Sequence, residues 1–69
     1  MINSFKRARL ILGLTQVELA DRLGISPVSV YKWEHGLGLP KAKRLNEVAS
    51  VLQTTVEELL RESEEKEVS

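Results

Sequence analysis

The stretch TQVELADRLGISPVSVYKWE, residues 15–34, decides the fold of this chain. Two short helical patterns flank a Gly-Ile-Ser break. Ala20, Gly24 and Val30 supply the small residue, the turn glycine and the buried branched residue of a tight helix-turn-helix. Such a motif holds its second helix away from the body of a small domain, where the helix can enter the major groove of DNA. The stretch therefore predicts sequence-specific DNA binding.

Capping signals and apolar spacing extend the helical pattern over most of the chain. Thr15 with Glu18 forms a capping box, Ser26 precedes a proline at a first helical position, and Thr55 with Glu58 repeats the box. The expected helices cover residues of about 4–12, 16–23, 27–34 and 41–52, and a fifth begins near residue 56. No segment has the alternation of a strand, so we expect an all-α fold, a compact five-helix bundle.

Charge is distributed unevenly along the chain, although the formal net charge is zero. Residues 1–44 carry eight basic and three acidic side chains, whereas residues 45–69 carry two basic and seven acidic ones. Because local charge sets the field that a phosphate backbone meets, a basic body can attract nucleic acid despite the neutral total. We expect one helix-turn-helix domain over residues 1–61 and a frayed acidic tail over residues 62–69.

The composition argues against other classes of protein. Sixty-nine residues make one small domain without room for a deep active site, and the lack of cysteine excludes disulfides and thiolate metal sites. No apolar run approaches the roughly 20 residues of a membrane span. The one histidine, His35, stands at a helix end without a nucleophile motif. We therefore expect no catalytic residue, metal, cofactor or small-molecule ligand, and a cytoplasmic protein.

The outward face of the second helix of the motif carries the side chains expected to meet DNA bases: Pro27, Val28, Ser29 and Lys32. Lys32 can donate to guanine O6 or N7, and Val28 can contact a thymine methyl group. Tyr31, on the same face, could reach a phosphate or a base edge. An ordinary surface position or a contact with a protein partner is the alternative for Val28 and Tyr31.

A second group of side chains is expected to contact phosphates: Gln16, Tyr31, Lys41, Lys43 and Arg44. Gln16 opens the first helix of the motif, where outward N–H groups can receive a phosphate. The three cations stand at the start of a helix, where they oppose the helix dipole, and a phosphate partner would offset that cost. A plain solvated surface is the alternative for all of them. Arg9 and Glu34 are expected to form an internal ion pair between the first helix and the end of the third.

These residues resemble the Cro and phage-repressor type of helix-turn-helix proteins, also called the Xre family. The resemblance extends over residues 5–60 and is carried by Arg9, GLTQVELADRLGIS (13–26), VYKWEHG (30–36), Pro40, LNEVASVL (45–52) and VEELL (56–60). It implies a lambda-repressor-like DNA-binding domain, a protein encoded by a prokaryote or a phage, and a homodimer on a two-fold-symmetric operator. It also implies that Gln16 bonds a phosphate, that Arg9 pairs with Glu34, and that bases are read from the four outward positions named above.

The sequence departs from the family pattern in two places. Pro27 and Val28 are poorer hydrogen-bonding residues than the polar pairs that many members carry there, so readout at these positions would rest on shape and methyl contact. The loop HGLGLP, residues 35–40, is more apolar than the loop of most members. Its Leu37 and Leu39 are either tucked core residues or a self-association patch. We favour a dimer interface, since this loop lies near the dimer contact in the family.

Two functions of different class are compatible with this sequence. The first is a transcriptional regulator, with repression as the favoured sense, that binds a palindromic operator as a homodimer. The homodimer forms either already in solution or only on DNA. The second is a protein-interaction module of the same fold, antitoxin-like or an anti-regulator. Only the first needs Gln16, Lys32 and the basic cluster of residues 41–44, so these residues favour DNA binding. An enzyme is not expected.

Overall fold

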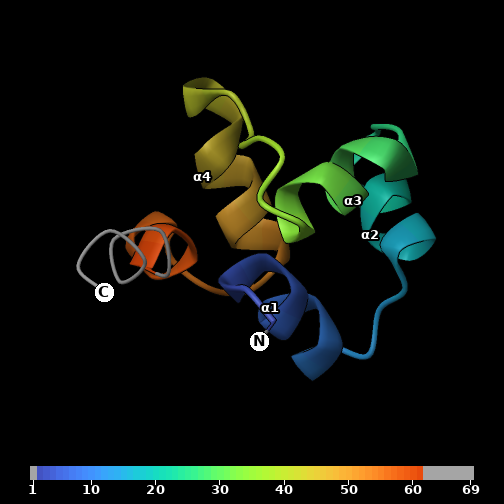
Figure 1. Ribbon diagram of the computed structural model, residues 1–69. Helices are drawn as coiled ribbons and strands as arrows, with labels where there is room; N and C mark the ends of the chain where they lie inside the picture. Colours follow the sequence, from blue (N-terminus) through green and yellow to red (C-terminus); the bar gives the residue numbers. More distant parts are fainter. Residues whose placement is uncertain (1, 62–69) are drawn as a thin grey trace.

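Five helical segments make up the fold of the computed structural model, which describes residues 2–61 (Figure 1). They are α1 (Ser4–Ile11), α2 (Gln16–Leu23), α3 (Pro27–Glu34) and α4 (Ala42–Val51), followed by a short helical stretch over residues 56–61. No strand occurs among the described residues, so the expected all-α, five-helix fold is confirmed. The bounds of α2 and α3 match the prediction, and α1 and α4 are one or two residues shorter. The acidic segment 62–69 lies outside the described residues.

The local signals around the motif act as the sequence predicts. The Thr15 hydroxyl accepts a hydrogen bond from the Glu18 N–H (3.0 Å), and the Glu18 carboxylate accepts one from the Thr15 N–H (2.8 Å). Gly24 ends α2 with φ of 66°, in the left-handed region that favours glycine. Ser26 caps α3, and Pro27 occupies its first turn. Short-range chemistry therefore fixes where the two helices of the motif begin and end.

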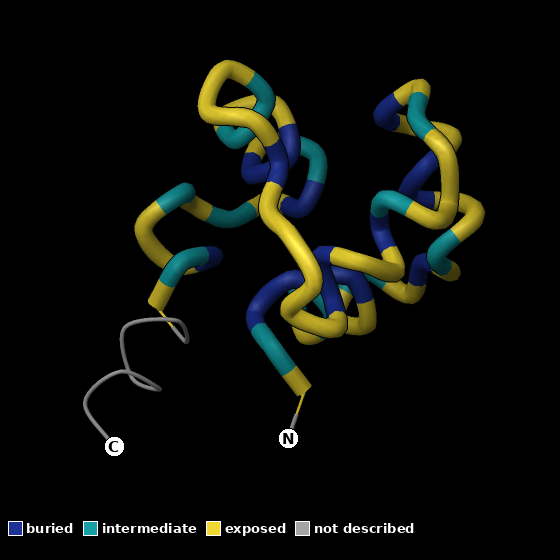
Figure 2. Tube along the Cα trace, turned by 45° about the horizontal axis from the view of Figure 1, so that its top comes forward, coloured by how far each residue is buried: buried dark blue, intermediate teal, exposed yellow. Residues whose placement is uncertain are grey.

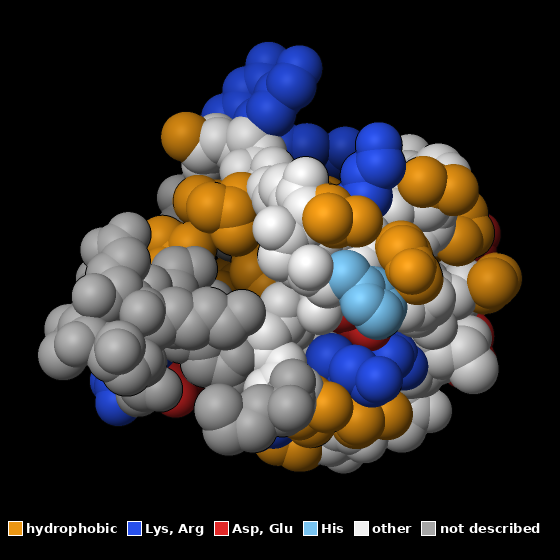
Figure 3. Space-filling model, in the orientation of Figure 1, with side chains coloured by type: hydrophobic (Ala, Val, Ile, Leu, Met, Phe, Trp, Pro, Cys, Tyr) orange, Lys and Arg blue, Asp and Glu red, His pale blue; other side chains and the backbone are white. Residues whose placement is uncertain are grey.

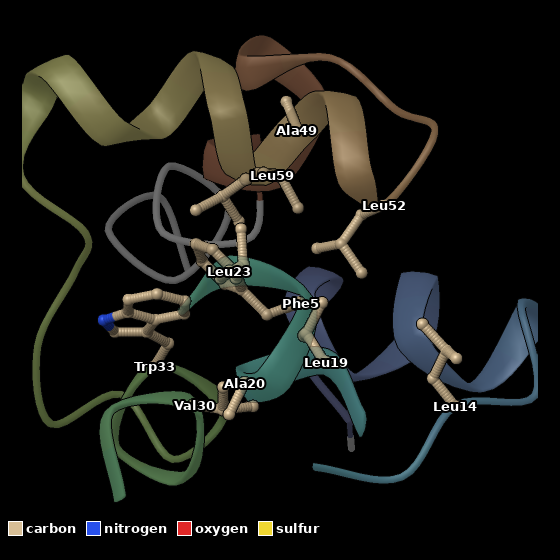
Figure 4. Packing of buried hydrophobic residues seen from close by; sticks show 11 residues of the cluster. Phe5, Leu14, Leu19, Ala20, Leu23, Val30, Trp33, Ala49, Leu52 and Leu59 are labelled. Atoms are coloured by element: carbon tan, nitrogen blue, oxygen red, sulfur yellow. The ribbon is translucent and has the colours of Figure 1, made fainter. Parts of the chain in front are cut away.

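The core lies where α1, α2, α3, α4 and residues 56–61 meet (Figure 4). Its most deeply buried large side chains are Leu19, Val30 and Val48, each less than 2% exposed. Trp33 is buried as well, and its ring lies 5.9 Å from that of Phe5, centroid to centroid. Because Val30 and Trp33 anchor α3 from its inner side, the opposite side of α3 is left at the surface.

Two side-chain contacts outside the apolar core hold the motif against its neighbours. The Asn3 carboxamide caps α1 by accepting from the Lys6 N–H, and its Nδ2 donates to the carbonyl of Trp33 (2.7 Å) near the end of α3. From α4, Arg44 Nη2 donates to the carbonyl of Leu23 (2.8 Å) at the end of α2. Carbonyls at helix C-termini have no intrahelical partner, so these donors stabilise both the helix ends and the packing of the motif.

Candidate nucleic-acid interface

The outer side of α3 carries the side chains expected to meet bases. Val28 is 59% exposed and Tyr31 46%, and Pro27 and Lys32 are exposed too, whereas Ser29 is half-buried. The surface is mixed rather than uniformly polar, with one ammonium group among apolar side chains. All four expected base-reading residues therefore lie on one element, with Ser29 nearest the edge.

An aromatic stack occupies the C-terminal end of this surface. The rings of Tyr31 and His35 lie 4.1 Å apart, centroid to centroid, with an interplanar angle of 29°. The pair is one helical turn apart, so the stack limits the rotamers open to the Tyr31 side chain. The sequence analysis did not foresee this contact, although the spacing of four residues between two rings was a signal for it. His35 thus belongs to the same surface as the expected contact residues.

The loop after α3 adds exposed apolar side chains. Leu37 is 65% exposed and Leu39 55%, and residues 35–39 form a continuous exposed run that ends at the buried Pro40 (Figure 2). Figure 3 shows hydrophobic side chains around the pale blue histidine, with Lys and Arg side chains above and below it. Of the two interpretations of Leu37 and Leu39, the tucked core is therefore wrong, because both side chains are at the surface.

The basic cluster at the start of α4 divides into two kinds of side chain. Lys41 and Lys43 are exposed. Arg44 is half-buried, because it donates to the carbonyl of Leu23 and also to the Glu47 carboxylate from Nε (3.1 Å) and Nη2 (2.9 Å). Arg44 therefore has a structural contact that the sequence alone did not indicate, in addition to its expected role.

A buried ion pair lies behind the interface. Arg9 Nε and Nη2 donate to the two oxygens of Glu34 at 2.6 and 2.9 Å, and Arg9 Nη1 donates to the carbonyl of Leu14 at 2.7 Å. The Arg9 and Glu34 side chains are 8% and 0% exposed. Gln16 Nε2 donates to the same carboxylate, 3.1 Å from Oε1. This last contact ties the start of α2 to the end of α3, and it too was missed by sequence reasoning.

The ionisation of Glu34 reflects two opposed effects. Burial raises the pKa of the Glu34 carboxyl, but the hydrogen bonds from Arg9 and Gln16 and the positive charges of Arg9 and Lys6 outweigh it, so the pKa lies below its ordinary value. A group whose pKa is lowered by folding stabilises the fold above its unfolded pKa, and this contribution is lost as the pH falls through the folded pKa.

We therefore expect acid to destabilise the domain through Glu34. The urea midpoint, followed by fluorescence of Trp33, should fall as the pH is lowered below roughly 4, where unfolded glutamates take up protons. The double variant Arg9→Met with Glu34→Leu is the control, and its midpoint should fall less over the same range. An equal fall in both proteins would show that other carboxyl groups cause the acid sensitivity.

No group of three or more His, Cys, Asp or Glu side chains is placed to hold a metal ion in residues 2–61. In the same part of the chain, no helix has the length and apolar character needed to span a bilayer.

Two short helices joined by residues 24–26, the first capped at both ends and the second exposed on its outer side, define a helix-turn-helix protein. The chain belongs to the helix-turn-helix family, whose model matches residues 5–59. It is 39% identical over 51 residues to the cryptic phage CTXphi transcriptional repressor RstR of Vibrio cholerae. The aligned residues make up 74% of this chain and 46% of that protein. It is 38% identical over 47 residues to the HTH-type transcriptional activator BcrR of Enterococcus faecalis, 68% of this chain and 23% of that one.

The family resemblance predicted from the sequence is thereby confirmed. The chain spans less than half the length of these two curated relatives. No solved structure matches it.

Proposed function

We propose that this domain binds double-stranded DNA and regulates transcription, with α3 as the recognition helix in the major groove. The observation that carries the proposal is the division of α3 into two sides. Val30 and Trp33 anchor the inner side in the core, whereas the outer side carries the exposed Val28, Tyr31 and Lys32. A helix held in this way can be inserted into a groove without loss of core contacts. The relatives named as transcriptional regulators support the same function.

Base readout is proposed for Pro27, Val28, Ser29 and Lys32. Lys32 is the main hydrogen-bond donor, because it can reach guanine O6 or N7 from the outer side of the helix. Pro27 and Val28 offer shape and methyl contacts with thymine instead. With a single cationic donor among these four side chains, recognition depends on close apolar fit at the neighbouring base pairs.

Phosphate contacts are proposed for two sites beside the recognition helix. Gln16 lies at the N-terminus of α2, where backbone N–H groups and the positive end of the helix dipole favour an anion. Lys41 and Lys43, together with Arg44, form the second site at the start of α4, and Tyr31 adds a hydroxyl from α3. These contacts would hold the duplex in register while α3 reads the bases.

We further propose that two copies bind a palindromic operator, with Leu37 and Leu39 at the contact between them. Both side chains are more than half exposed on a loop next to α3, and burial of such a pair against a second copy would remove apolar surface from water. Repression is the favoured sense of regulation. One of the two relatives is named as a repressor and the other as an activator, so this part of the proposal rests mainly on the first.

Selection from a random duplex library tests the proposed function. We expect an enriched consensus with two-fold symmetry and half-sites about one helical turn apart, roughly 34 Å. Binding of the winning duplex should weaken steeply with salt, because bound cations release counterions from the backbone. A consensus without symmetry would contradict the homodimer only. Failure to enrich any sequence would contradict DNA recognition and favour a protein-interaction module.

Removal of the two exposed lysines at the start of α4, Lys41 and Lys43, should lower the salt dependence of binding. For Lys41→Gln with Lys43→Gln, each lost phosphate contact is expected to reduce the slope of log K against log salt by about 0.9. The loss should be similar for the selected duplex and for random duplex, since phosphates carry no sequence information. Arg61→Gln, on the short helix of residues 56–61, removes a charge away from this face and is the control. A slope equal to that of the unmodified protein would mean that neither lysine contacts a DNA phosphate.

A further inference from the structure

Three donor nitrogens converge on the carboxylate of Glu34, and they come from two residues on different helices. Arg9 reaches it from α1 with two nitrogens, and Gln16 reaches it from the first position of α2. Glu34 itself is the last residue of α3. Arg9 and Glu34 are both buried, whereas Gln16 is only half-buried, so part of its carboxamide faces the surface. The glutamine is thus the one member of the cluster that can touch a ligand.

The carboxylate determines which end of the Gln16 carboxamide faces inward. A carboxylate accepts hydrogen bonds and donates none, so it selects the NH₂ group and disfavours the amide oxygen. One N–H of that group is used on Glu34, and the second remains for another acceptor. A phosphate is also an acceptor only, so it too requires the NH₂ group.

The backbone at the start of α2 offers donors beside this amide. The first N–H groups of a helix have no intrahelical partner. The capping box occupies those of Thr15 and Glu18, at 2.8 and 3.0 Å, which leaves the N–H groups of Gln16 and Val17 as the donors of the first turn. A phosphate at this position would therefore meet two backbone donors and the second N–H of the Gln16 side chain.

We propose that Glu34 is a positioning residue for DNA binding, which holds the Gln16 carboxamide with its NH₂ group ready for a backbone phosphate. Arg9 fixes the carboxylate in place through two hydrogen bonds. Without the carboxylate, the amide can rotate and present its oxygen to the phosphate, which repels it. The proposal rests on the proposed function, because it assigns a role in DNA binding to an ion pair that lies inside the domain. An amide oriented in advance loses less conformational freedom on binding.

A double-mutant cycle separates this role from a purely structural one. Arg9→Met with Glu34→Leu replaces the ion pair by apolar side chains of similar volume, a change that is often neutral for stability. Gln16→Ala is made in the unmodified protein and in this double variant, and each protein is titrated with the selected operator duplex. Gln53→Ala, which removes a carboxamide after the end of α4, is the matched control. Circular dichroism confirms that every variant is folded at the temperature of the titration.

The expected result is loss of the glutamine contribution when its anchor is removed. Gln16→Ala should lower affinity about tenfold in the unmodified protein, the size of one hydrogen bond to a charged group. In the Arg9→Met, Glu34→Leu background it should lower affinity less than about twofold, and that background should itself bind about tenfold more weakly than the unmodified protein. The salt slope should not change, because glutamine carries no charge. Gln53→Ala should bind like the unmodified protein.

A nitrogen-15 spectrum of the Gln16 side chain gives a second readout that needs no DNA. In the unmodified protein the two amide protons should differ in shift and in exchange with water by more than those of a free carboxamide, because one of them is bonded to Glu34. The difference should shrink in the Arg9→Met, Glu34→Leu variant.

Two outcomes would overturn the proposal while the proposed function stands. One is an equal effect of Gln16→Ala in both backgrounds, and the other is no effect in either, with the unmodified protein still selecting and binding its duplex. Failure of the unmodified protein to bind any duplex would overturn both this proposal and the proposed function. The spectrum would then show only whether the Gln16 amide is bonded to Glu34.

Discussion

Glu34→Ala is expected to remove a large part of the stability of the fold at room temperature. The substitution leaves the Arg9 guanidinium buried without its carboxylate, and removal of one partner from a buried ion pair costs about 3–5 kcal/mol. A domain of this size has a free energy of unfolding of only about 3–9 kcal/mol, at roughly 0.05–0.15 kcal/mol per residue. The loss therefore approaches the whole stability of the fold.

Urea unfolding monitored by the single tryptophan, Trp33, measures this effect. Trp33 is 8% exposed in the fold, so its fluorescence should report the core directly. Arg9→Met with Glu34→Leu is the matched control and should remain folded with a midpoint near that of the unmodified protein. A free energy of unfolding for Glu34→Ala within about 1 kcal/mol of that of the unmodified protein would mean that water reaches Arg9 and replaces its partner.

Lys32→Ala is expected to weaken the sequence preference of DNA binding at one base pair of each half-site. Good contacts between a side chain and a base edge contribute about 1–3 kcal/mol of discrimination, so affinity for the selected duplex should fall roughly 5- to 150-fold. Affinity for random duplex should fall much less, since only one general electrostatic contact is lost. The preference should relax at a single position of each half-site, and a repeated selection with the variant should identify that position.

A lysine at the phosphate-facing site provides the control for this prediction. Lys41→Ala removes the same charge and the same side chain from the start of α4 instead of from α3. It should weaken binding to selected and random duplexes by the same factor, which leaves the ratio of the two affinities unchanged. If Lys32→Ala also left that ratio unchanged, Lys32 would be a phosphate contact and base readout would rest on Pro27, Val28 and Ser29.

Local signals made much of the fold predictable from the sequence. The Thr15 and Glu18 box, the left-handed Gly24 and the Ser26 cap each depend on residues within three or four positions, and the structure has all three. The spacing of the motif also predicted that Val30 is buried, and it is 0% exposed. These features are short-range, so a single sequence is enough to recognise them.

The hydrogen bonds of the candidate site were less predictable, because they join residues that are distant in the sequence. Gln16 bonds Glu34 across 18 positions, Asn3 bonds the Trp33 carbonyl across 30, and Arg44 bonds the Leu23 carbonyl across 21. No local pattern encodes which carbonyl or carboxylate a long polar side chain will meet. These partners are set by how the helices pack, and packing follows from the whole core.

By itself, the sequence determined the helix-turn-helix, the helix whose outer side is exposed and the basic character of the body, because caps, glycine and apolar periodicity act over a few residues. Only the tertiary structure decided that the Gln16 amide donates to Glu34, that Arg44 donates to the carbonyl at the end of α2, and that Leu37 and Leu39 are exposed. The physical reason is that a polar side chain satisfies its hydrogen bonds with whichever buried group the folded core brings within reach.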